Sequence, residues 1–154
     1  MTRIRKPAGP VVEGWKDDAL TVWVPGRPAN MKNKVGHWST RAKWAKGWRA
    51  RAAAHLAFSW STRPVPFNGK ASEKNMGWPW APEEPKRVTF TIYGPSRFDD
   101  DNCALVASPC RDALQDMRII DNDGNPAHRF LYEQATPTRK AGAAHGIAIK
   151  VELA

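Results

Sequence analysis

Four segments of the chain alternate between apolar and polar positions with the period of two that is typical of β-strands. In the clearest of them Val88, Phe90 and Ile92 share one side, so this strand is expected to bury one face. The predicted strands cover residues 20–24, 86–93, 130–134 and 147–153.

Two further segments have the spacing of helices. The first carries apolar residues four positions apart, namely Trp44, Trp48, Ala52 and Leu56. This stripe predicts a helix from Ser39 or Thr40 to about Phe58. A second helix is predicted from Asn102 to about Met117, where Pro109 either kinks the helix or occupies its first turn behind Ser108.

The elements follow one another as βαβαββ, which predicts a small α/β (α+β) domain with a mixed sheet and two main helices. This single domain would occupy residues 19–154, because residues 1–18 are polar, carry Pro and Gly, and are expected to form a loosely held arm. Residues 59–85 contain five prolines and two glycines. They are expected to form a long irregular insertion, anchored on the domain by Trp78-Pro79-Trp80.

Composition narrows the class of protein. An apolar fraction of 42% in 154 residues is enough for one ordinary core, and no apolar run is long enough to span a membrane. The first residues lack the apolar stretch of a signal peptide, so a cytoplasmic protein without a membrane partner is expected. Cys103 and Cys110 are seven positions apart and are expected to be buried thiols rather than a disulfide or a zinc site.

The charge of the chain is unevenly distributed. Residues 27–51 contain eight bases and no acid, which favours a nucleic-acid partner over a protein that is merely basic. Residues 99–123 contain seven acids and two bases, which gives this segment a charge of −5. Because the net charge of the chain is +9, the remaining residues together carry +14. An acidic patch in a basic protein suits a metal-dependent nuclease, because the bases attract phosphate and the acids hold the ion.

The candidate chemistry begins at Asp99-Asp100-Asp101. Adjacent carboxylates repel one another, and Mg²⁺ relieves that cost because it takes oxygen ligands. On an extended segment Asp99 and Asp101 point the same way and Asp100 points away, and a return loop is expected to bring Asp123 back to this strand tip. The alternative is that the three carboxylates cap the following helix, although one would suffice for a cap.

The segment Asp121–Asn125 faintly resembles a calcium-binding loop. Its sixth position is Pro126 and its twelfth is Tyr132, whereas an EF-hand requires Gly and Glu there. A simple turn stabilised by Asp121 and Asn125 is therefore the better interpretation.

Taken together, four motifs resemble the RusA family of small phage and prophage Holliday-junction resolvases, over residues 19–153. The motifs are Pro25-Gly26-Arg27-Pro28, Asp99-x-Asp101-Asn102, Pro109-x-x-Asp112-Ala113-Leu114 and Ile120-Asp121-Asn122-Asp123. The resemblance implies that Asp99, Asp101 and Asp123 are catalytic and bind one or two Mg²⁺ ions, for which Mn²⁺ can substitute. Asp121 is a possible substitute ligand. The resemblance also implies a homodimer that acts on branched DNA in the cytoplasm of a bacterial host.

The chain departs from the family at Ser108, where a lysine usually precedes the proline of the helix. Arg111, or the lysines of the first helix, could replace the missing charge. The residues expected to contact DNA are Arg27, Lys32, Lys34, Lys43, Lys46 and Arg111.

The function that follows is Mg²⁺-dependent, structure-selective hydrolysis of four-way DNA junctions in recombination and repair, leaving a 5′-phosphate and a 3′-hydroxyl. The main alternative is a non-catalytic binder of branched or duplex DNA whose nuclease centre has decayed at Ser108. A third interpretation is a flap or general nuclease on the same scaffold.

Overall fold

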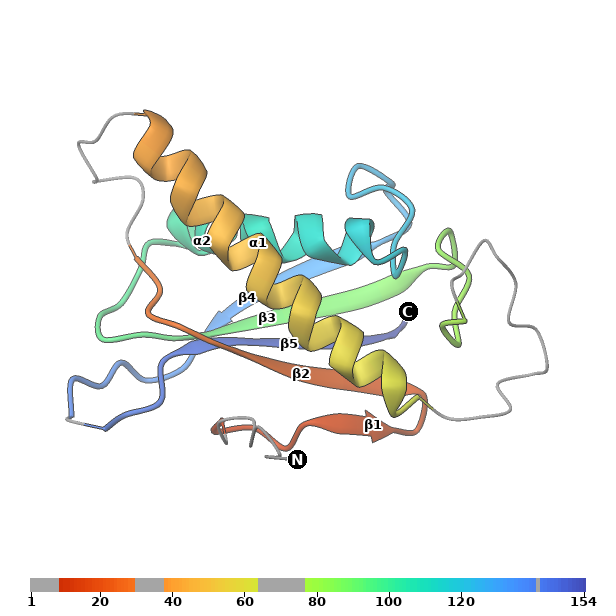
Figure 1. The fold of residues 1–154 in the computed structure, drawn as a ribbon, viewed down its shortest axis with the longest axis horizontal. Coiled ribbons are helices and arrows are strands. Elements are labelled where there is room, and N and C mark those ends of the chain that lie inside the picture. Colours follow the sequence, from red (N-terminus) through yellow and green to blue (C-terminus); the bar gives the residue numbers. More distant parts are fainter. Residues whose placement is uncertain (1–8, 30–37, 64–76, 141) are drawn as a thin grey trace, which may run out of the picture.

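The computed structural model describes residues 9–29, 38–63, 77–140 and 142–154, and it has a sheet of five strands packed against two helices (Figure 1). The strands are β1 (Gly14–Lys16), β2 (Ala19–Pro25), β3 (Lys86–Tyr93), β4 (Arg129–Gln134) and β5 (Gly146–Leu153). The helices are α1 (Trp38–Ser61) and α2 (Asp100–Asp116). This is a small mixed α+β fold, so the predicted fold class is confirmed.

The sheet has the order β1-β2-β5-β3-β4, and β5 is its central strand. Neighbouring strands are antiparallel except for β3 and β4, which are parallel and are joined through α2. The alternation seen in the sequence places Val22, Phe90 and Ile149 in the core with Trp48 and Leu56 of α1. One face of the sheet is therefore buried under both helices.

The N-terminal arm was expected to be loosely held, and this expectation is wrong for its last residues. Gly14–Lys16 forms the edge strand β1, because Asp17 and Asp18 adopt φ angles of 49° and 64° and turn the chain back onto β2. Two residues with positive φ make the tight hairpin turn that suits twisted strands. The arm is also tied down by Trp15, whose Nε1 donates to the Ser59 carbonyl at 3.0 Å.

Helix α2 starts two residues earlier than predicted and contains Pro109 in its interior. Of the two placements considered for this proline, the first helical turn is therefore wrong. Pro109 has no N–H to donate to the carbonyl of Leu105, one turn earlier, so the helix lacks one backbone hydrogen bond at its middle.

The part of the insertion that the structure describes is anchored as expected. Trp78 and Trp80 are buried, and the indole of Trp78 donates to the Met117 carbonyl at 2.7 Å. The rest of the insertion, residues 64–76, lies outside the described residues.

Cys103 and Cys110 are buried free thiols, which confirms the prediction for them. Burial raises the pKa of the Cys110 thiol to about 12, so this thiol is unreactive at neutral pH. Within the described ranges no helix has the length and apolar character needed to cross a membrane.

Candidate functional site

The three adjacent carboxylates lie at the start of α2, at the end of the loop that follows β3. Asp99 is the N-cap residue, with φ −64° and ψ 155°, and Asp100 and Asp101 occupy the first turn of the helix. The expectation of an extended segment is therefore wrong beyond Asp99, because helical geometry begins at Asp100. Successive helical residues turn by about 100°, and Asp100 accordingly lines a hollow beside β4 with Arg97 and Gln134.

The structure weakens the interpretation of these acids as a helix cap. A capping aspartate accepts a hydrogen bond from a backbone N–H of the first turn, but the Asp99 side chain makes no such bond. All three side chains are exposed, and none forms a hydrogen bond or an ion pair with any residue that the structure describes. The positive end of the helix favours their charge, and among the described residues no side chain competes with a cation for their oxygens.

Gln134, at the end of β4, fixes the chain immediately before Asp99. Its amide nitrogen donates to the Phe98 carbonyl and its amide oxygen accepts from the Phe98 N–H, both at 2.7 Å. Phe98 itself is buried, at 4% exposure. This paired contact holds the backbone of the acidic segment against the sheet. No pattern in the sequence indicated the role of Gln134, because a glutamine at the end of a strand does not reveal which distant backbone group it contacts.

Asn102 lies in the same helical turn as the three carboxylates, and its side chain helps to decide whether the start of α2 suits a metal ion. Its side chain is 1% exposed, and neither its amide oxygen nor its amide nitrogen has a partner among the described residues. Burying an amide without partners is costly, so an unpaired amide beside free carboxylates indicates a polar ligand. The donor set of carboxylates and an amide is the hard-oxygen type that Mg²⁺ prefers, and these residues therefore fit the ion.

The bases predicted to contact DNA are divided between the acidic end and the outer face of α1. Arg27 is exposed and lines a hollow of about 420 Å³ with Trp44 and with Pro95, Ser96 and Phe98 of the acidic loop. Lys43 and Lys46 are exposed on α1, whereas Lys32 and Lys34 lie outside the described residues. A cationic and aromatic surface thus borders Asp99.

Trp44 also borders a second, smaller groove between α1 and α2. This groove has a volume of about 170 Å³, and Leu105, Ser108, Pro109 and Asp112 line its α2 side. The sequence predicted Trp44 only as part of the buried stripe of α1. The structure leaves it half-buried, between the two hollows.

Asp123 lies at the opposite end of α2 from Asp99 and Asp101, so the expected return to the strand tip is wrong for a single chain. Its backbone N–H donates to Gln115 in the last turn of the helix, at 3.3 Å. Gln115 is 14 residues beyond Asp101, or about 20 Å along the helix axis. The cause is the parallel pairing of β3 and β4, because the loop after the connecting helix must then reach the start of β4, at the opposite end of the strands from the end of β3 (Figure 1). Within the described ranges no three Asp, Glu, His or Cys side chains are placed to share an ion.

The carboxylates at this second end are paired with arginines. Arg49 of α1 donates twice to Asp116, at 2.6 Å each, and this contact lowers the pKa of Asp116. Partial burial raises the pKa of Asp112, which the Arg49 charge opposes and the charge of Asp123 reinforces. The acids of this end therefore act as ties between α1, α2 and the following loop.

Arg111 belongs to the second end too. It donates to the Tyr132 hydroxyl at 2.8 Å, lies 4.2 Å above the Phe130 ring and approaches the Asp123 carboxylate at 3.5 Å. It is ten residues from Asp101 along α2, so its contacts place it with Asp123 rather than with the acidic N-terminus. Its role in DNA binding stays a prediction.

Asp121, the possible substitute ligand, is an exposed residue whose carboxylate contacts the buried His128. The Lys86 backbone N–H donates to His128 Nδ1 at 3.3 Å, which leaves the proton on Nε2 to donate to Asp121 at 2.7 Å. Desolvation raises the pKa of Asp121. The hydrogen bonds that its carboxylate accepts from His128, Asn125 and the Asn122 amide outweigh this effect, so the pKa lies below its ordinary value. The interpretation of Asp121 and Asn125 as the stabilising residues of a turn agrees with this network.

Lys86 is fully buried and its ammonium donates to the carbonyls of Ala81, Pro82 and Glu84 at 2.6–3.2 Å. Burial lowers its pKa to about 8. Sequence reasoning missed this residue, although the strand register carried a signal: Lys86 shares a face with Val88 and Phe90. Its contacts join the insertion to β3.

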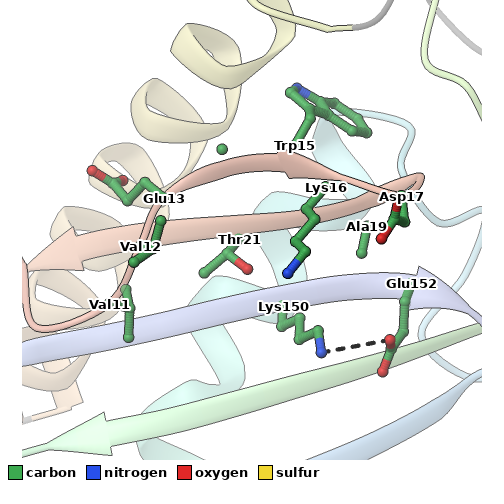
Figure 2. A pocket seen from close by; sticks show the side chains of 11 residues that line it. Val11, Val12, Glu13, Trp15, Lys16, Asp17, Ala19, Thr21, Lys150 and Glu152 are labelled. Carbon is green, nitrogen blue, oxygen red and sulfur yellow. Dashed lines mark ion pairs between the residues drawn. The ribbon is translucent and has the colours of Figure 1, made fainter.

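A larger hollow lies elsewhere, beside the hairpin β1–β2 (Figure 2). Its volume is about 860 Å³, and its charged lining residues are Lys16, Lys150, Glu13, Asp17 and Glu152. Lys150 is paired with Glu152 at 3.6 Å. Two bases against three acids give this surface no excess of positive charge, so it does not suit a polyanion.

Comparison of the chain with known protein families and with curated proteins finds no match. The resemblance to the RusA family therefore rests on the residues themselves.

Proposed function

We propose that this protein is a Mg²⁺-dependent, structure-selective endonuclease that hydrolyses four-way DNA junctions. The observation that carries the proposal is the group of three exposed carboxylates at the start of α2, which have no partner among the described residues in a chain of charge +9. The acids at the other end of the helix, by contrast, are paired with arginines.

Asp99 and Asp101 would hold the ion, with Asn102 behind them. A bound Mg²⁺ supplies an acidified water and neutralises charge on the scissile phosphate. Gln134 keeps the acidic segment in place through the Phe98 backbone. Arg27 and the lysines of α1 would attract and position the DNA backbone without reading its sequence.

The test is cleavage of a synthetic four-way junction with Mg²⁺, with Mn²⁺ and with chelator, beside a flap and a linear duplex of the same sequences. We expect cleavage of the junction only when metal is present, with 5′-phosphate ends. Equal cleavage of flap or duplex would favour a general nuclease and would contradict selectivity for junctions.

The metal can be tested without activity. Mg²⁺ should raise the melting temperature, because it binds the folded state and relieves repulsion among the carboxylates. The Asp99→Asn, Asp101→Asn double variant should lose this shift, whereas Asp116→Asn should keep it. A parent protein that shows no shift at millimolar metal would count against the site.

Two observations favour the second candidate, a DNA-binding protein without catalysis. A single chain leaves Asp123 about 20 Å from Asp101 along α2, and Ser108 stands where the resembled family has lysine. If the protein binds junctions tightly but cuts none of them with any divalent metal, this second function is the correct one.

A further inference from the structure

The hollow of about 420 Å³ beside the acidic loop has no part in the chemistry proposed above. Its walls come from three segments that are distant in the chain: residues 27–29 after β2, Trp44 of α1, and Pro95, Ser96 and Phe98 before α2. Asp99 follows Phe98 directly in the chain, so the hollow lies next to the three carboxylates. A group bound in this hollow would therefore neighbour the candidate metal site.

Trp44 brings aromatic surface to the hollow. The next residue of its stripe, Trp48, is 1% exposed, whereas Trp44 is only half-buried and lines the hollows on both of its sides. Its ring meets that of Trp48 with the centroids 6.2 Å apart and the planes inclined by 55°. Proteins that bind single-stranded nucleic acid stack the bases on aromatic side chains that stand in a basic groove. The surface of Trp44 suits such stacking.

The lining of the hollow carries one positive charge and, among the described residues, no negative charge. Arg27 is exposed and supplies the positive charge, and the rest of the lining is apolar apart from the exposed Ser96. An apolar lining with a few polar groups is typical of a binding pocket. An arginine binds phosphate well, and a serine hydroxyl both donates and accepts hydrogen bonds. The lining is therefore complementary to a nucleotide, without a group that selects one base.

The two walls of the hollow are held by the fold. On one side Gly26 has a φ of 147°, a Cβ at this position would lie 3.1 Å from the Trp48 ring, and the Gly26 N–H donates to the His145 carbonyl at 3.0 Å. On the other side Gln134 fixes the backbone of Phe98 through two hydrogen bonds. A preformed site loses less entropy when a ligand binds, so the hollow is suited to binding a rigid, flat group.

We propose that this hollow receives one unpaired nucleobase of the DNA strand that is cut, with the base stacked on Trp44 and its phosphate bound by Arg27. The inference rests on the proposed nuclease function and adds a reason for its selectivity. A base leaves the stack at least cost where its pairing is already disturbed, as it is where strands exchange partners at a branch point. Since every base has an aromatic face, the site accepts all four bases.

The decisive experiment measures binding to four-way junctions in the presence of chelator, so it does not depend on cleavage. One base at a time is removed around the branch point, which leaves an abasic sugar with its phosphates in place. At one or two positions, removal of the base should weaken binding by the parent at least about fivefold. Trp44→Leu should weaken binding to the intact junction by a similar factor and should be insensitive to the same abasic sites, so the two changes are coupled.

Two further variants separate stacking from a defect in the fold. Trp44→Phe keeps an aromatic face and should remain sensitive to the abasic sites. The matched control, Trp60→Leu, replaces a tryptophan that is 37% exposed in the last turn of α1, and it should bind every junction as the parent does.

Salt dependence separates the two parts of the site. Arg27→Ala should reduce the slope of log K against log salt by about one unit, because one phosphate contact is lost. Trp44→Leu should leave the slope unchanged, because stacking neutralises no charge. Equal changes of slope for both variants would contradict a stacking role for Trp44.

A second measurement uses the parent protein alone. 5-Iodouracil is placed at the position where base removal has its largest effect, and irradiation links it to an aromatic ring in contact with it. Mass spectrometry of the digested complex should locate the link at Trp44. Links that form only at other residues contradict the site.

The inference is overturned if Trp44→Leu loses the same affinity for junctions with and without each base, because the tryptophan then acts only through the fold. Cleavage of junctions by the parent would leave the proposed function standing in that case. A parent that binds neither junctions nor duplex overturns the proposed function and the inference together.

Discussion

The two ends of α2 carry the same kind of side chain in opposite states. At the first end Asp99, Asp100 and Asp101 are exposed and have no partner among the described residues. At the second end Asp116 is held by Arg49 and Asp123 by Arg111. The difference separates acids that stabilise the fold from acids available to a ligand, a distinction that a count of acidic residues does not make.

The difference between the two ends of α2 is tested most directly by replacing one carboxylate at each end. Asp101→Asn should lower junction cleavage at least about 100-fold, since even residues behind metal ligands typically account for 10–100-fold. Asp116→Asn keeps the shape of its side chain and should leave the rate within about twofold, because Asp116 serves Arg49. Single-turnover rates on one junction measure both. Equal losses would mean that the second end is also catalytic.

The buried network at the second end should appear in the pH dependence of stability. The pKa of Lys86 is lowered to about 8 in the folded state, from an ordinary value of 10.5. At pH values between these two pKa values, Lys86 is mostly protonated in the unfolded chain and mostly neutral in the folded one. Unfolding therefore takes up a proton from about pH 8 to 10.5, and stability rises with pH in that window. The full gain is roughly 3 kcal/mol.

Comparison with Lys86→Met isolates this effect, because methionine cannot titrate. The difference in free energy of unfolding between parent and variant, from urea titrations at several pH values, should grow in favour of the parent above pH 8. Parallel curves would show that the buried ammonium keeps an ordinary pKa.

Arg111→Ala tests whether the second end is structural. The change removes the contacts to Tyr132, Phe130 and Asp123 and should lower stability by about 2 kcal/mol, the range for hydrogen bonds to a charged group. The matched control is Arg129→Ala, an exposed arginine on β4. If thermal unfolding shows the same small change for both, Arg111 does not tie the helix to the sheet.

The smallest effect is expected from the lysines of α1. Replacing Lys43 and Lys46 by Ala should weaken DNA binding and reduce the slope of log K against log salt by about one unit for each phosphate that these lysines neutralise. Stability should stay unchanged, because both side chains are exposed. An unchanged slope would assign phosphate binding to other bases, with Arg27 the first to test.

Much of the fold follows from local pattern. Alternation located the four longer strands, and the four-residue spacing from Trp44 to Leu56 located α1, because a buried face imposes its period on the sequence. The strand β1 was missed since three residues show no period, and Asp17-Asp18 lacks the glycine that usually marks a tight hairpin. The buried Lys86 was overlooked because a lysine at the start of a strand is usually exposed.

The site could be predicted only in part. The motif around Asp99 located carboxylates that are exposed and have no partner among the described residues, since residues adjacent in the chain stay close together in any fold. The placement of Asp123 depends on whether β3 and β4 are parallel, and this is a property of the sheet rather than of the residues near Asp123. Partners across the fold, such as Gln134 for Phe98, are invisible for the same reason.

The central position of β5 has a consequence for how the protein is made. This strand is the last in chain order, yet it pairs with β2 on one side and β3 on the other. Until β5 has left the ribosome, β2 and β3 have no strand between them and the apolar residues of both stay open to water. The growing chain therefore depends on late, long-range pairing, which is slow to form. The nascent chain stays open to chaperone binding or aggregation until residues 146–153 have left the ribosome.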